Sequence, residues 1–130
     1  MAGETYSQII DNANLPIFHG WSAKSVTCSA NTHLTAEIDI GQWNYIAVLM
    51  PATFDGYATI AFKGATSSGG TFSAIYQSNG NEMTQYATQN TWSVVGPASL
   101  APFRYIKIQF GASGETASQS VAKTLYVTGK

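Results

Sequence analysis

The sequence has few charged residues and a single cysteine. Aspartate, glutamate, lysine and arginine make up 10% of the 130 residues, against about 25% in ordinary soluble domains. Lysine and arginine number 6 and the formal net charge is −1. The chain therefore lacks the concentrated basic face that nucleic acids and anionic membranes require, and we expect neither as a partner. Because Cys28 is the only cysteine, no disulfide can form within the chain.

Long apolar runs and a signal peptide are also missing. No apolar stretch approaches the roughly 20 residues of a membrane-spanning helix. The start, M-A-G-E-T-Y-S-Q, has neither the basic residues nor the apolar core of a secretory signal, which predicts a protein made in the cytoplasm. The chain is 45% hydrophobic, so at this length it can form one domain around its own core.

The groups that carry catalysis or hold metals are few and scattered. Cys28 and His33 have no nucleophile-elbow sequence around them, and together they match no structural zinc spacing. Glu37 and Asp39 could stand at a separation suited to glycoside hydrolysis, but alternate strand residues commonly do. Asp39 and Asp55 leave a calcium site conceivable, while a solvated strand face explains the same carboxylates. We therefore expect a protein that is not an enzyme, with no catalytic residue, no metal and no cofactor.

What the sequence has instead is a two-residue periodicity, clearest between residues 34 and 63. Apolar and polar residues alternate over 34–40 and again over 58–63, after an Asp55-Gly56 turn. Residues 45–50 include no charged or amide side chain, which predicts a strand covered on both faces or at the centre of a sandwich. Further short strands are expected at residues 26–29, 72–76, 83–86, 91–95, 105–110 and 121–128. This pattern predicts an all-β fold, an antiparallel β-sandwich of jelly-roll type.

The first 25 residues show no clean period and are expected to form an irregular N-terminal arm, with the sandwich domain over 26–130. The arm could fold back over the edge of the sandwich or dock on a neighbouring subunit or partner. Either arrangement would cover exposed strand edges. The apolar and aromatic residues of the arm are the candidate contact residues: Tyr6, Ile9, Ile10, Leu15, Ile17, Phe18 and Trp21.

Aromatic residues are plentiful, at 12% of the chain. Trp43 and Trp92 each lie close to an asparagine, an arrangement typical of sugar-binding sandwiches, where an exposed ring stacks on a pyranose and amides bond its hydroxyls. Packing beneath loops or at subunit contacts explains such rings equally well. Trp43 and Trp92 are therefore the candidate surface aromatics.

Several short motifs recur in a pattern that resembles one family. They are I-D-I-G at 38–41, M-P-A at 50–52, I-A-F at 60–62, T-F-S-A-I-Y at 71–76, S-N-G at 78–80 and R-Y-I-K-I at 104–108. In these motifs the chain resembles a set of small virion proteins of tailed bacteriophages. It departs from them after the phenylalanine strand, where relatives often carry a Ser-Asp-Gly turn and this chain has K-G-A-T-S-S-G-G at 63–70.

The resemblance implies a non-enzymatic virion structural protein. The role it implies first is a capsid decoration, or cement, protein on the outer surface of the shell, with the major capsid protein as partner and a trimer as the favoured homo-oligomer. The apolar residues of the N-terminal arm would make the capsid or subunit contact. The alternative is a carbohydrate-binding module on the virion surface that attaches the phage to its host.

Overall fold

The computed structural model describes residues 22–41, 43, 45–56, 58–95, 100 and 102–129. Within these residues the secondary structure consists of β-strands, and every strand pairing is antiparallel. The strands are β1 (Ser22–Cys28), β2 (Ile38–Asp39), β3 (Ile46–Leu49), β4 (Thr59–Ala65), β5 (Ser73–Ala74), β6 (Thr84–Tyr86), β7 (Trp92–Val95), β8 (Tyr105–Phe110) and β9 (Lys123–Gly129). The predicted all-β class is confirmed.

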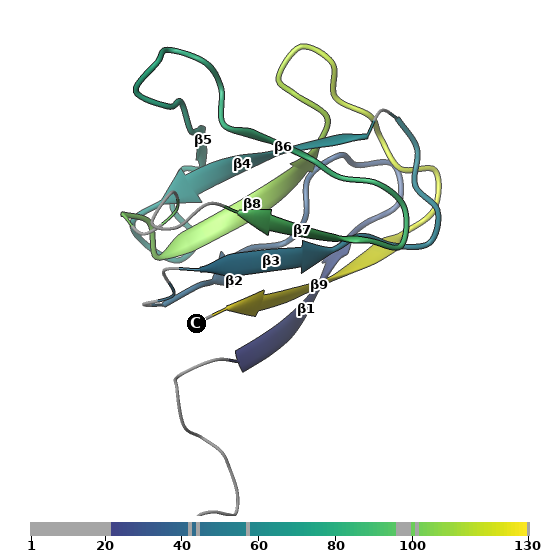
Figure 1. The fold of residues 1–130 in the computed structure, drawn as a ribbon, viewed down its shortest axis with the longest axis horizontal. Coiled ribbons are helices and arrows are strands. Elements are labelled where there is room, and N and C mark those ends of the chain that lie inside the picture. Colours follow the sequence, from purple (N-terminus) through teal and green to yellow (C-terminus); the bar gives the residue numbers. More distant parts are fainter. Residues whose placement is uncertain are drawn as a thin grey trace, which may run out of the picture.

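The strands form two sheets (Figure 1). The first has the order β1-β9-β3-β7, and the second has the order β2-β8-β4-β5 with β6 also paired to β4. The chain crosses between them repeatedly, because β1, β3, β7 and β9 belong to the first sheet and the strands between them belong to the second. The antiparallel sandwich is thus the observed architecture. The finer jelly-roll description stays a prediction, with which this alternation is consistent.

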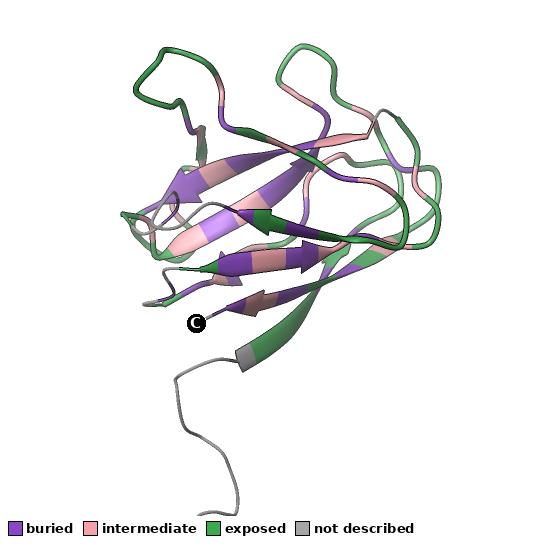
Figure 2. Cartoon of the chain, viewed as in Figure 1, coloured by how far each residue is buried: buried purple, intermediate pink, exposed green. Residues whose placement is uncertain are grey.

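The core lies between the two sheets, and buried residues alternate with more exposed ones along β3, β7 and β9 (Figure 2). Ile106, Ile108 and Phe110 face inward from β8, as the alternation over 105–110 predicts. Phe62 and Val48 are also fully buried and face the core from β4 and β3. A period of two in the sequence is therefore enough to place these side chains.

Residues 45–50 were expected to be covered on both faces or to lie at the centre of a sandwich. The second alternative fits, because β3 is an inner strand of the first sheet, burial alternates along it and Tyr45 is exposed. The first sheet therefore has one open face. The strand predicted over 121–128 begins at Lys123 as β9, so Val121 lies before it and is exposed.

The 34–40 segment is regular only over its last residues, at β2. The alternation breaks because Thr35 is buried while Ala36 is exposed. The Thr35 hydroxyl accepts the amide hydrogen of Ile108 at 2.9 Å and donates to the carbonyl of Ala36 at 2.9 Å. A side chain thus takes the place of a backbone partner, which the apolar-polar pattern does not reveal.

β1 begins before the expected domain boundary. Residues 22–25 belong to the first sheet, although the sequence assigned them to the arm. All seven residues of β1 pair with β9, from Ser22 opposite Gly129 to Cys28 opposite Lys123. β1 is an edge strand of this sheet.

Candidate interaction surface

The open face of the first sheet carries no charged side chain among its described residues. Cross-strand pairing places Trp92, Leu49 and Tyr126 in one row and Val94, Ala47 and Thr128 in the next. We call this surface the neutral face. Its residues are Ala23, Ser25, Thr27, Ala47, Leu49, Trp92, Val94, Thr124, Tyr126 and Thr128.

Of the two lysines of the first sheet, Lys24 points away from the neutral face and Lys123 stands at its edge. Lys24 alternates with Ala23 and Ser25, and its ammonium donates to the carbonyl of Asp39. Lys123 donates to the Thr53 hydroxyl at 3.2 Å. The strand period keeps Lys24 off the neutral face, while Lys123 lines a hollow at its edge together with Leu49 and Tyr126.

Large apolar groups on the neutral face remain half exposed. Trp92 is 52% exposed and Tyr126 is 53% exposed, and Leu49 lies between them. Contiguous exposed apolar groups on a soluble domain mark a surface that meets another molecule. Tryptophan and tyrosine are the residues most enriched at such contacts.

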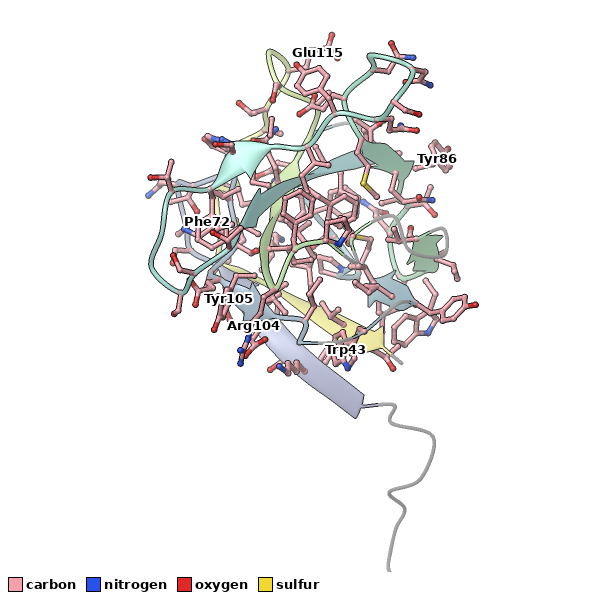
Figure 3. All side chains as sticks on the ribbon, turned by 90° about the vertical axis from the view of Figure 1, so that its left-hand side faces the viewer. Trp43, Phe72, Tyr86, Arg104, Tyr105 and Glu115 are labelled. Carbon is pink, nitrogen blue, oxygen red and sulfur yellow. The ribbon has the colours of Figure 1, made fainter. Side chains whose placement is uncertain are left out.

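The outer side of the second sheet is charged instead. Arg104 and Asp39 form an ion pair at 3.3 Å. Lys63 and Lys107 are direct cross-strand neighbours, and the Lys107 ammonium lies 4.7 Å from the centre of the Phe72 ring. Figure 3 shows Phe72 and Arg104 on the same side of the molecule. The sandwich therefore presents one neutral and one charged surface.

The carboxylates on the charged side act as structural hydrogen-bond acceptors. Glu37 accepts from the Gly69 amide at 2.8 Å and from the Ser68 hydroxyl at 2.6 Å, and these two bonds lower its pKa. The hydrogen bond from Arg104 and that from the Gly41 amide lower the pKa of Asp39. A general acid in glycoside hydrolysis needs a raised pKa, so this pair does not suit that chemistry. That the protein is not an enzyme stays a prediction.

Cys28 and Asp55 also lie in surroundings that suit a structural role. The Cys28 thiol is fully buried, and burial raises its pKa, the opposite of what a nucleophile needs. Asp55 accepts from the amide and the hydroxyl of Ser120 at 2.7 and 2.9 Å. Within the residues that the structure describes, no three histidine, cysteine or acidic side chains gather as a metal site would require. The same part of the chain includes no helix long and apolar enough to cross a membrane.

Of the two candidate surface aromatics, only one is at the surface. Trp43 is 8% exposed, so its assignment as a surface aromatic is wrong. The reason is a tertiary contact: a Cβ added to Gly129 would lie 2.1 Å from the Trp43 ring, so the ring packs directly on backbone. The Lys24 ammonium, 5.4 Å from the ring centre, covers it further. Trp92, in contrast, is half exposed and lies on the neutral face at the edge strand β7.

The candidate contact residues of the N-terminal arm lie outside the described residues. They are Tyr6, Ile9, Ile10, Leu15, Ile17, Phe18 and Trp21. The neutral face itself was missed from sequence. Its signal is the uncharged alternation in the T-L-Y-V-T run of β9 and in the W-S-V-V run of β7.

Comparison with known proteins finds a similarity of fold. No family model matches the chain, and no curated protein matches its sequence. The fold is similar to that in the crystal structure of the SPBc2 prophage-derived protein YomS, with a TM-score of 0.50 and 14% sequence identity. The match covers 89% of this chain and 98% of YomS. At this level of identity the comparison shows a shared fold.

Proposed function

We propose that the protein is a non-enzymatic virion structural protein of a tailed bacteriophage, acting as a capsid decoration protein. In this role it binds the outer surface of the shell, has the major capsid protein as its partner and adds contacts that stabilise the shell. The neutral face carries the proposal. The shared fold with a prophage-derived protein and the motif resemblance to phage virion proteins support it.

The neutral face suits a contact with a folded protein surface. It has no ion to desolvate, so burying it costs little. About half of the Trp92 and Tyr126 side chains is still exposed, which leaves roughly 100 Å² on each ring to bury. At about 25 cal/mol per Å², each ring contributes about 2.5 kcal/mol on docking.

One such contact is weak on its own. Stable complexes bury roughly 800 Å² per partner, more than these rings supply. Residues 1–21, which lead into β1 at the edge of the same sheet, would extend the contact. A homo-oligomer, with a trimer favoured, would present several neutral faces at once and bind with avidity. The trimer and the position on the virion surface belong to the proposal.

Co-sedimentation with empty shells of the major capsid protein tests this function. We expect the wild-type protein to pellet with shells and Trp92→Ala to bind about 50- to 100-fold more weakly, since about 2.5 kcal/mol of contact is lost. Tyr86→Ala is the matched control, because Tyr86 is 72% exposed but belongs to the second sheet. A wild-type protein that never pellets with shells, or equal binding by Trp92→Ala and Tyr86→Ala, would contradict the proposal.

A further inference from the structure

A hollow of about 360 Å³ opens at the edge of the neutral face, where β3 ends and β9 begins. It is continuous with the neutral face, because Leu49, Thr124 and Tyr126 belong to both. The other walls come from the residues that follow β3, from the turn before β7 and from the start of β9. We call this site the Lys123 hollow.

Among the described residues that line the hollow, Lys123 alone carries a charge. Its side chain is half-buried, and its ammonium donates to the Thr53 hydroxyl at 3.2 Å. Thr53 lines the same hollow, so this bond holds the ammonium at the wall. A lysine ammonium has three N–H donors, and the bond to Thr53 occupies one of them. Lys123 can therefore bond a second group that enters the hollow.

Asp55 is a carboxylate that the charge of Lys123 reaches within the protein. Its Oδ2 accepts from the amide and the hydroxyl of Ser120 at 2.7 and 2.9 Å. These bonds lower the pKa of Asp55 most, and the charge of Lys123 lowers it less. Asp55 is not part of the lining. Ser120 is therefore the main partner of this carboxylate, which leaves Lys123 able to bind another anion.

Backbone hydrogen bonds fix two walls of the hollow against each other. The amide of Met50 donates to the carbonyl of Thr91 at 3.0 Å, and the amide of Asn90 donates to the carbonyl of Pro51 at 3.0 Å. The turn between these walls is held by the Thr91 hydroxyl, which donates to the carbonyl of Thr88 at 2.8 Å. A side chain that enters the hollow therefore meets walls that are already ordered, and little affinity is lost in ordering them.

Docking on the neutral face covers the hollow, because Leu49 and Tyr126 are common to both surfaces. A purely apolar partner would remove water from the Lys123 ammonium and leave it with hydroxyl oxygen alone. Burying a charge without an opposite charge is costly, and burying it with a bonded carboxylate is far less so. The position of Lys123 thus favours a partner that brings its own carboxylate.

We propose that the Lys123 hollow binds an acidic side chain of the protein that docks on the neutral face. The inference rests on the proposed function and names the chemistry of the partner. An aspartate or glutamate carboxylate on the surface of the major capsid protein accepts a hydrogen bond from the Lys123 ammonium. Apolar groups beside it pack on Leu49, Tyr126 and Trp92.

Binding curves from co-sedimentation with shells of the major capsid protein test the site. Lys123→Gln removes the charge, and we expect it to bind about ten-fold more weakly at low salt, as expected for one hydrogen bond between charged groups. Lys123→Arg keeps a cation and should bind nearly as well as the wild type. Lys123→Glu should bind more weakly than Lys123→Gln, since two carboxylates would then meet. Added salt should narrow the difference between Lys123→Gln and the wild type.

Lys63→Gln is the matched control, because Lys63 is also half-buried but belongs to the second sheet. It makes the same change in net charge and should leave shell binding unchanged. Equal binding by Lys123→Gln and Lys63→Gln would overturn the inference, and so would equal losses for Lys123→Gln and Lys123→Arg. A loss of self-association in light scattering, with shell binding intact, would assign the hollow to a second copy and overturn it too.

The same assay separates this inference from the proposed function. If Trp92→Ala weakens shell binding and Lys123→Gln does not, the capsid contact stands and the acidic partner group is refuted. If the wild-type protein never pellets with shells, both are refuted.

Discussion

Replacing Gln119 tests how much its side-chain hydrogen bonds stabilise the loops of this sandwich. Its side chain is fully buried, and its Oε1 accepts from the Asp55 amide at 2.9 Å. Its Nε2 donates to the carbonyl of Asp55 at 3.0 Å and to that of Ala117 at 2.9 Å. One side chain therefore ties the turn before β4 to the loop before β9.

We expect Gln119→Met to lower the free energy of unfolding by about 3 kcal/mol. The estimate takes three hydrogen bonds at roughly 1 kcal/mol each, with a side chain of similar length left in place. Gln109→Met is the matched variant, because Gln109 is also buried but, within the described residues, its side chain donates one hydrogen bond, to the Gly111 carbonyl at 3.0 Å. Its expected loss is about 1 kcal/mol.

Urea denaturation followed by tryptophan fluorescence measures both losses, and thermal melts give a second reading. For a domain of this size, 1 kcal/mol shifts the melting temperature by about 3–5 °C, so we expect shifts of about 9–15 °C and about 3–5 °C. The urea slope should stay constant, since neither variant changes the surface exposed on unfolding. Equal losses for the two variants, or none for Gln119→Met, would refute the hydrogen-bond count as the source of the stability.

Two further expectations concern pH and thiol chemistry. Hydrogen bonds to the carboxylates lower the pKa values of Glu37, Asp39 and Asp55 in the folded state. Their stabilisation is therefore complete above the unfolded values, which lie near 4, and is lost as the pH falls through the lower folded values. Melting temperatures should be level from pH 8 to about pH 5 and fall below about pH 4, and a melting temperature that is already falling at pH 6 would contradict this. Because Cys28 is fully buried and its pKa is raised, a thiol reagent should label the protein only as fast as it unfolds, and rapid labelling of the native protein would show that the site is open.

The strands that could be predicted from sequence are those in which one face is apolar and buried and the other is polar. Residues 105–110 show this best, since their alternation alone places Ile106, Ile108 and Phe110 in the core. The burial of Thr35 could not be predicted in this way. An apolar-polar pattern counts threonine as polar and does not show that its hydroxyl bonds the backbone of another strand. Trp43 failed for a related reason: its burial depends on Gly129, a residue from the other end of the chain.

The candidate surfaces were harder to predict than the strands. The neutral face needs the registers of four strands at once, because Trp92, Leu49 and Tyr126 come from separate parts of the sequence. This surface appears only when the strands are brought side by side.

The pairing of Ser22 with Gly129 has a mechanical consequence. A load applied between these two residues separates β1 from β9 one residue pair at a time, like a zipper, because both ends of the load sit at the same end of the strand pair. β1 is an edge strand, so in the first sheet β9 alone resists its removal. If the protein is tethered to an expanding shell through the segment before Ser22, β1 would be the first strand to peel away, and the tether would lengthen while the rest of the sandwich remains folded.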